Sequence, residues 1–284
     1  MIRIMSDSTC DLSPELIEKH QITIMPLSII LGEDEYLDGR GITPEEIYAW
    51  SDSHRAPPKT AAFSEAQAVD CIRPWVEAGD ELICFAISES MSASAQVIRL
   101  AAQELGAEDR VHVIDSQNLS TGVGLLVIEA AIMAREGKPA GEIVATVEAL
   151  RPQVRASFVV DTLVYLHRGG RCSGLAAMMG GALKLHPRIS VENGKMLPGK
   201  KYRGNMDRVI RQYATDMRED LLAARPDRVF ITHSGCPDTQ VAEVKAWLEE
   251  LHHFTDIHIT RAGGVVSSHC GPGTLGVLFI DGRE

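Results

Sequence analysis

Short apolar runs alternate with segments of helical period through the first half of the chain. Four runs have the length and the β-branched content of strands, at residues 2–5, 22–30, 82–87 and 111–114. The segments between them open with helix-capping sequences: Ser13-Pro14, Thr43-Pro44-Glu45-Glu46 and Ser64-Glu65-Ala66-Gln67. Strands that alternate with helices predict a mainly parallel sheet covered on both faces, so we expect an α/β domain with three layers.

The pattern loosens in the second half. Asn193-Gly194 between two apolar runs is a strong hairpin signal, and a short helix is expected to stop at Gly169-Gly170. Longer helical periods cover 204–224 and 238–252, and strand-like runs lie at 158–160, 229–232, 257–260 and 275–280. This half predicts an α+β domain with a mixed or antiparallel sheet. We expect the two domains to span residues 1–154 and 155–284.

Polar side chains cluster where the predicted parallel strands end. Such clusters lie at 6–9, 88–94 and 115–116, and in parallel sheets ligands bind beyond the carboxyl ends of the strands. Ser92 is expected to open the helix that follows, so its hydroxyl and the next backbone N–H groups suit an anion. Thr60 lies in an extended segment before the helix start predicted at Ser64, and its hydroxyl and the following backbone N–H groups likewise suit an anion. Both patterns are also those of ordinary capping residues, and this alternative stays open.

A histidine near the end of the chain is the clearest titratable candidate. His269 precedes a glycine-rich turn within 268–273, and an imidazole beside free amides suits binding or catalysis, although a lone histidine is more often structural. Cys270 is adjacent, but sequence neighbours on a turn usually point apart, which disfavours a nucleophilic pair. The glycines at 169–170 predict a close backbone approach, and Arg171 beside them is interpreted as structural.

The charge is divided unevenly between the halves. The net charge is −11; residues 1–150 carry 10 basic against 25 acidic side chains, whereas residues 151–284 carry 18 against 14. An acidic half repels nucleic acid, so nucleic acid is not an expected partner. The segment 184–211 holds eight basic residues and two acidic ones. It could attract an anionic group or an acidic partner, or simply be a solvated surface.

The remaining composition favours a cytoplasmic protein. The chain has no run of about 18 apolar residues, so a membrane span is not expected. The first residues have the pattern of a strand rather than of a signal sequence. The six cysteines are scattered without a CxxC pair, which favours reduced thiols over a disulfide framework or a zinc site. We therefore expect cytoplasmic localisation, no metal and no stable membrane insertion.

Seven motifs, in order along most of the chain, resemble the DegV family. They are SDSTCDL, PPKT, ISESMSAS, VIDSQNLSTGVGLLV, YLHRGGRCSG, KKYRG and SSHCGPGTLG. The resemblance implies two α/β domains that clasp one long-chain fatty acid, such as palmitate or oleate, with no other cofactor. It also implies a carrier without catalytic residues of its own, which presents the acyl carboxyl group to a separate fatty-acid kinase for acyl-phosphate formation.

The resemblance also implies where the carboxylate binds. The matching positions in this chain are Thr60, Ala61, Ser92, Ala93, Arg203 and His269. The chain departs from the family pattern at Ala61-Ala62, where a second hydroxyl is lost, and at Ala93, where a glycine is lost. Arg203 and His269 are expected to flank the mouth of the site and to stabilise the developing acyl phosphate more than to hold the acid.

Burial of the acyl chain would supply most of the binding free energy. Roughly 15 methylenes at about 0.8 kcal/mol each give on the order of 12 kcal/mol before ordering costs, whereas an unpaired carboxylate taken from water costs several kcal/mol. The tail is expected to lie against the second domain, where flexible methionines suit chains of several shapes. The residues expected there are Met178, Met179, Leu183 and Ile189.

Two other functions remain open from the residues. The first is a serine-dependent hydrolase or acyltransferase that uses Ser92 and His269 with an aspartate such as Asp7, although no G-x-S-x-G elbow is present. The second is a phosphate-binding domain, similar to a dihydroxyacetone kinase, that uses the basic segment 184–211, although no P-loop is present. Mass spectrometry of solvent extracts of the purified protein would distinguish a bound fatty acid from ester turnover or a bound nucleotide.

Overall fold

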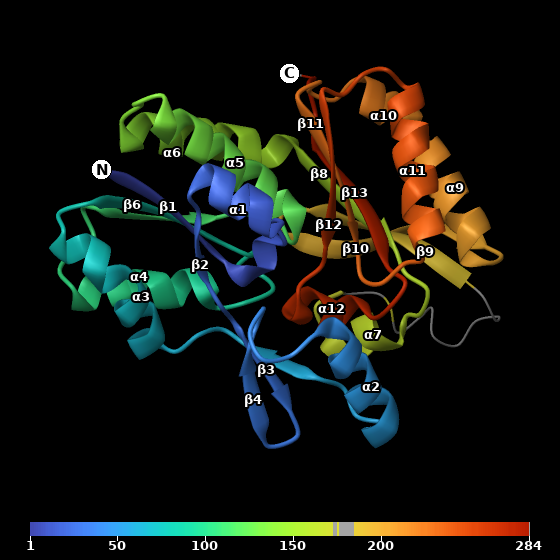
Figure 1. Ribbon diagram of the computed structural model, residues 1–284, viewed down its shortest axis with the longest axis horizontal. Coiled ribbons are helices and arrows are strands. Elements are labelled where there is room, and N and C mark those ends of the chain that lie inside the picture. The colour runs from blue at the N-terminus through green and yellow to red at the C-terminus, as the bar shows by residue number, and fades with distance from the viewer. Residues whose placement is uncertain (173–174, 176–184, 284) are drawn as a thin grey trace.

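The first sheet of the protein is parallel, as predicted. The structure is a computed structural model that describes residues 1–172, 175 and 185–283, and the sheet has the strand order β2-β1-β6-β7 (Figure 1). Its strands are β1 Ile2–Asp7, β2 Thr23–Met25, β6 Glu81–Ala86 and β7 Val111–Asp115. The run 22–30 is not one strand, because Pro26 cannot donate to a ladder; after it, β3 Ser28–Leu31 joins a different sheet.

Helices cover both faces of this sheet. They are α1 Pro14–His20, α3 Glu65–Glu77, α4 Ser94–Glu104, α5 Thr121–Arg135 and α6 Ala140–Leu150. Figure 1 shows α5 and α6 on one face and α3 and α4 on the other, which gives the three predicted layers. Ser13 and Ser64 cap their helices as predicted, Ser64 with a full capping box.

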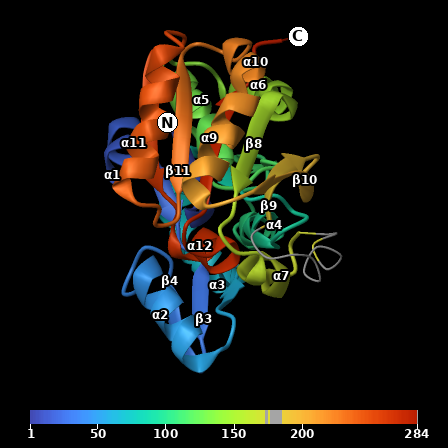
Figure 2. The ribbon, with the colours of Figure 1, turned by 90° about the vertical axis from the view of Figure 1, so that its right-hand side faces the viewer.

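A small antiparallel sheet projects from this body together with a helix (Figures 1 and 2). Its order is β4-β3-β5, with β4 at Asp34–Leu37 and β5 at Lys59–Ala61, and the helix is α2 Pro44–His54, capped by Thr43. Strands of three or four residues give too little periodicity to be predicted from sequence. The sheet matters for the site because β5 carries Thr60.

The second large sheet is mixed, as predicted. Its order is β10-β9-β8-β13-β11-β12, and all neighbouring pairs are antiparallel except β11 with β12. The strands are β8 Val154–Val159, β9 Leu185–Glu192, β10 Lys195–Arg203, β11 Arg228–His233, β12 Asp256–Arg261 and β13 Leu275–Ile280. The hairpin between β9 and β10 is confirmed, with φ of 49° at Asn193 and 78° at Gly194, the signs that a type I′ turn requires.

The helices of the second half lie around this sheet, as Figure 2 shows. They are α7 Val164–Gly169, α9 Met206–Asp216, α10 Arg218–Leu222, α11 Asp238–Glu250 and α12 Gly264–Cys270. The predicted helix 204–224 is two helices that meet at the buried Met217, so that prediction is wrong. α7 ends at Gly170 in the left-handed conformation, as predicted.

The core joins the two halves of the chain. One cluster of buried apolar residues takes members from both sheets, including Ile83 and Phe85 of β6, Phe158 of β8 and Leu278 of β13. The division of the chain at residue 154 stays a prediction. In the part of the chain that the structure describes, no helix has both the length and the apolar character required to cross a membrane.

Candidate ligand cavity

An apolar cavity of about 260 Å³ lies between elements from both halves of the chain. The walls are formed by β5, the loop from β6 to α4, α12, β10 and Arg171, which follows the C-cap of α7. Most of the lining is aliphatic or sulfur-containing, and includes Leu27, Ile87, Met91, Leu119, Met196 and Val266. The polar side chains on its wall are few, namely Thr60, Ser92, Arg171 and His269. Apolar walls with a few convergent polar groups are typical of small-molecule sites.

Thr60 and His269 meet at the wall of this cavity. The Thr60 Oγ1 lies 2.8 Å from the His269 Nε2, although the residues are 209 positions apart. The other ring nitrogen of His269, Nδ1, is buried and has no hydrogen-bond partner among the described residues. Burial, with a contribution from the nearby Arg171, lowers the pKa of His269 to about 4, so the imidazole is neutral at pH 7.

Ser92 lies before its helix rather than at the helix start. α4 begins at Ser94, with Ala93 in the N-cap position and no side-chain cap, so the prediction that Ser92 opens the helix is wrong. The Ser88 carbonyl accepts hydrogen bonds from the backbone N–H groups of Met91 and Ser92. Because this turn precedes the helix, α4 begins two residues after Ser92. The Ser92 Oγ lies 2.9 Å from the Ser94 Oγ.

The residues around these two hydroxyls line the same cavity. Ala61 and Ala62 follow Thr60 along the wall, and Ala93 follows Ser92. Ala61 and Ala93 are exposed. The structure therefore brings together five of the six residues that sequence reasoning assigned to the carboxylate.

Arg203, the sixth, is placed elsewhere. It lies at the end of β10 in a separate surface hollow with Lys200, Lys201 and Arg208, and its role toward a carboxylate stays a prediction. The guanidinium at the cavity belongs to Arg171, whose Nη1 donates to the Gly169 carbonyl at 2.7 Å. Sequence reasoning interpreted Arg171 as structural; the unusual pair of glycines before it was the available signal.

Of the predicted tail residues, the structure describes Ile189 alone, and it does not line the cavity. Met178, Met179 and Leu183 lie outside the described residues. Ile189 is fully buried in the hydrophobic core and is not among the residues that line the cavity. The course of a tail past Ile189 therefore stays a prediction.

Two buried carboxylates hold the beginning of α12. Asp11 accepts a hydrogen bond from the Gly263 N–H at 2.8 Å and another from the Ser120 hydroxyl at 2.6 Å. Asp38 accepts from the Gly264 N–H at 2.7 Å and from the Ser8 hydroxyl, also at 2.7 Å. Burial raises the pKa of both carboxyl groups, that of Asp11 to about 8.

α12 lies close against its neighbours. A Cβ at Gly264 would come within 2.5 Å of the Ile29 Cδ1 and 3.0 Å of the Ile47 Cδ1, so a side chain there would clash. At the other end of the helix, a Cβ at Gly169 would come within 2.3 Å of the His269 Nδ1. Both glycines are therefore fixed by close approach, and the second bears directly on the histidine ring.

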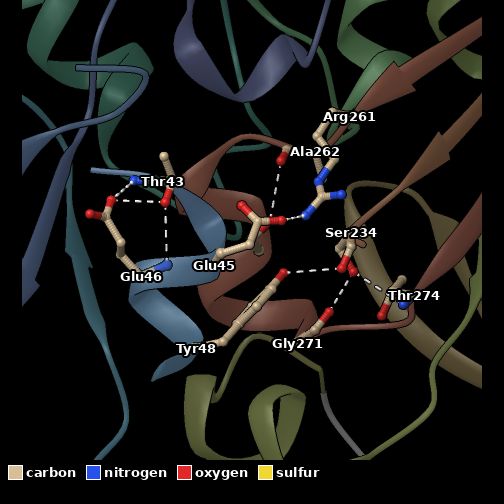
Figure 3. Close-up of polar contacts among 10 residues, drawn as sticks. Thr43, Glu45, Glu46, Tyr48, Ser234, Arg261, Ala262, Gly271 and Thr274 are labelled. Atoms are coloured by element: carbon tan, nitrogen blue, oxygen red, sulfur yellow. Dashed lines mark hydrogen bonds and ion pairs between the residues drawn. The ribbon is translucent and has the colours of Figure 1, made fainter. Parts of the chain in front are cut away.

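Contacts from α2 support the segment that follows His269 (Figure 3). The Tyr48 hydroxyl donates to the Ser234 carbonyl at 3.3 Å, and Glu45 forms an ion pair with Arg261. The Ser234 hydroxyl donates to the carbonyl of Gly271, the residue that ends α12 with a φ of 74°. Figure 3 shows these side chains converging between the helix and the strand ends.

The geometry gives no support to a serine hydrolase. The His269 imidazole contacts Thr60 and the Ser92 hydroxyl contacts Ser94, so neither is bonded to the other. Asp7 accepts from Thr9 and from the Ile87 N–H instead of orienting the histidine. Burial raises the pKa of Asp7 to about 6.

An α/β fold with an apolar cavity and two hydroxyls at its wall has the features typical of a small-molecule-binding protein. Residues 1–282 match the family model described as "Uncharacterised protein, DegV family". A DegV domain-containing protein of Deinococcus radiodurans is 33% identical over 278 residues, which cover 98% of each chain. The chain therefore belongs to the DegV family.

Solved structures show the same fold over the whole chain. A fatty-acid-binding DegV family protein from Thermus thermophilus has a TM-score of 0.90 at 30% identity, with 99% of each chain covered. A stearic-acid-binding protein from Eubacterium ventriosum has a TM-score of 0.86, also at 30% identity and 99% coverage of both chains. These similarities confirm the predicted family and fold class.

Proposed function

We propose that this protein binds one long-chain fatty acid, with the carboxylate at Thr60, Ser92 and His269 and the acyl chain in the apolar cavity. The observation that carries the proposal is the convergence of two hydroxyls and a neutral imidazole on the wall of an otherwise apolar cavity. The fatty acids bound by structurally similar DegV proteins support the choice of ligand.

The polar groups match the requirement of the carboxylate. Hydroxyl donors and the Arg171 guanidinium, which also lines the cavity, can offset the cost of removing the charge from water. The Thr60 hydroxyl is hydrogen-bonded to His269 in the structure. An entering carboxylate would accept from both residues, with the His269 Nε2 carrying the proton.

Ligand binding tests the proposal directly. A delipidated sample should gain thermal stability on addition of palmitate or oleate, because the ligand binds the folded state alone. Thr60→Val and Ser92→Ala should each weaken binding by about 1.5–3 kcal/mol, the loss expected for a hydrogen bond to a charged group. Thr255→Val is the matched control, since Thr255 is exposed and its hydroxyl has no partner among the described residues. Absence of a shift across C12 to C20 acids would refute the proposal.

We further propose that the protein is a carrier, which presents the bound carboxyl group to a fatty-acid kinase for acyl-phosphate formation. The basic hollow of Lys200, Lys201, Arg203 and Arg208 would attract an acidic partner, with a salt-sensitive rate of association. Arg203→Ala should retain normal fatty-acid affinity but lose acyl-phosphate formation when kinase and ATP are supplied, whereas Arg218→Ala at another exposed position should retain both. Equal phosphorylation of the two variants would remove Arg203 from the transfer step.

A further inference from the structure

A second hollow lies where two strands of the mixed sheet separate. β8 and β9 are paired only at Ser157–Val159 with Arg188–Ser190. Beyond these pairs, the beginning of β8 and the end of β9 diverge, and a hollow of about 410 Å³ occupies the gap. Gln117 and the short helix at Arg151–Gln153 close its other side. None of its lining residues lines the apolar cavity, so this is a separate site.

The lining of this hollow is strongly basic. Arg151, Arg155 and Arg188 line it against a single carboxylate, Glu192. Arg155 forms an ion pair at 3.0 Å with Asp281, a carboxylate that Arg283 also binds. Arg151 and Arg188 form no ion pair with any residue in the described part of the chain, and two uncompensated guanidinium groups at one hollow attract an anion.

Of the two arginines, Arg188 gives the stronger evidence for an anion site. Its Nε is buried and has no hydrogen-bond partner among the described residues, although buried donors in folded proteins are nearly always paired. The guanidinium lies over the Tyr213 ring, 5.9 Å from its centroid. Asp216 is close enough for Arg188 to contribute to its lowered pKa, but its carboxylate is bonded to Lys200 and Tyr202. Arg188 is thus a cation over an aromatic ring, lining the hollow, with one donor that no described residue satisfies.

Arg151 is fixed on the opposite side of the hollow. Its Nη1 donates to the Asp115 carbonyl at 3.1 Å, which leaves the other donors of the guanidinium uncommitted. Ser190, Gln117 and Asn193 add neutral polar groups to the lining. The two arginines thus approach one space from different elements, with hydrogen-bonding side chains between them.

We propose that this hollow binds a small phosphate-bearing anion between Arg151 and Arg188. Planar guanidinium groups bind phosphate oxygens in pairs, and an anion at Arg188 would satisfy the buried Nε. The volume suits a small molecule, since interfaces with macromolecules require a far larger contact surface. The hollow shares no lining residue with the apolar cavity or with the basic surface at Arg203.

Titration with inorganic pyrophosphate, followed by calorimetry and by the ³¹P line width at constant ionic strength, tests this site. We expect saturable binding to the parent protein, and a dissociation constant raised at least tenfold in Arg151→Gln and in Arg188→Lys. Arg218→Gln is the matched control, because it removes one exposed guanidinium away from the hollow and should leave pyrophosphate affinity unchanged. Urea titration of every variant reports whether its fold is intact.

Three results would overturn the proposal. The first is the absence of saturable pyrophosphate binding by the parent protein. The second is equal binding by Arg151→Gln and the Arg218→Gln control, a comparison that decides the matter even where the Arg188 variant does not fold. The third is citrate binding as tight as that of pyrophosphate, which would indicate a general anion site. Inorganic phosphate, titrated separately, shows whether a single phosphoryl group is sufficient or a diphosphate is required.

Discussion

The two ends of α12 differ in how completely their polar groups are satisfied. At its beginning, the N–H groups of Gly263 and Gly264 donate to the carboxylates of Asp11 and Asp38, which hydroxyls also bind. At its end, His269 has one nitrogen on Thr60 and the other without a partner among the described residues. The end whose polar groups are all hydrogen-bonded fixes the position of the helix, whereas the end with an unpaired polar group can accept a ligand. A single short helix therefore combines an anchor with a binding group.

Removal of the anchor should have the largest effect. Asp38→Ala deletes the acceptor for the Gly264 N–H and the Ser8 hydroxyl and leaves the buried Gly264 donor without a partner, which should lower the free energy of unfolding by roughly 3 kcal/mol. Urea titration measures this loss. Asp34→Ala, at an exposed position of the same strand region, should change it by less than about 0.5 kcal/mol. Equal stability of the two variants would mean that α12 is not anchored through Asp38.

The anchor should also make stability depend on pH. The pKa of Asp11 is raised in the folded state to about 8 from the model-compound value of 3.8, so the folded protein binds a proton that the unfolded chain has released. Its contribution is complete below pH 3.8 and is lost as the pH rises through 8. Between about pH 6.5 and pH 9 the free energy of unfolding should fall by about 2 kcal/mol.

Asp11→Asn isolates this contribution. The variant lacks the titrating group, so its stability should be flatter over the same interval. Asp7 and Asp38 also have raised pKa values through burial and remain in both proteins. Their charges contribute to the raised pKa of Asp11, so the difference between the two curves reports Asp11 together with its coupling to them. Parallel pH curves for the parent and the variant would show that Asp11 titrates normally.

The smallest effect is expected at the C-terminal end of α12, where His269 lies. Gly169→Ala places a Cβ within 2.3 Å of the His269 Nδ1, which must displace the imidazole and should weaken palmitate binding by about 1 kcal/mol, roughly fivefold. Gly141→Ala, where nothing lies within 4 Å of the new Cβ, should leave the affinity unchanged. If Gly169→Ala lowers stability without any change in affinity, the position of His269 is structural rather than ligand-related.

The parts of the fold that depend on neighbours in sequence were predictable. The parallel strands, the caps at Ser13, Thr43 and Ser64, and the Asn193-Gly194 turn each follow from a local pattern. The start of α4 was placed two residues too early, because a turn closed by the Ser88 carbonyl, which accepts from the N–H groups of Met91 and Ser92, precedes the helix.

The support of the site was not predictable from the sequence. Asp11 and Asp38 lie in polar stretches that resemble turns, and their partners at Gly263 and Gly264 are more than 200 residues away. Arg171 likewise follows a glycine pair, and the sequence does not show why the glycines are there. The structure explains Gly169, because the His269 ring lies against it. Thr60, Ser92 and His269 were candidates from local patterns that ordinary capping and structural residues share, and the family resemblance was needed to assign them to a carboxylate.

The contact between Thr60 and His269 has a consequence for how the protein folds. It joins residues 209 positions apart, and the α2 contacts that brace the same region span 186 and 216 positions. Contacts this distant form slowly, because loop closure must precede them. During synthesis the amino-terminal sheet is complete while α12 is still to be made, so a nascent chain carries its hydroxyls without a cavity. The cavity therefore closes among the last events of folding, and a chain truncated before residue 264 would have no site at all.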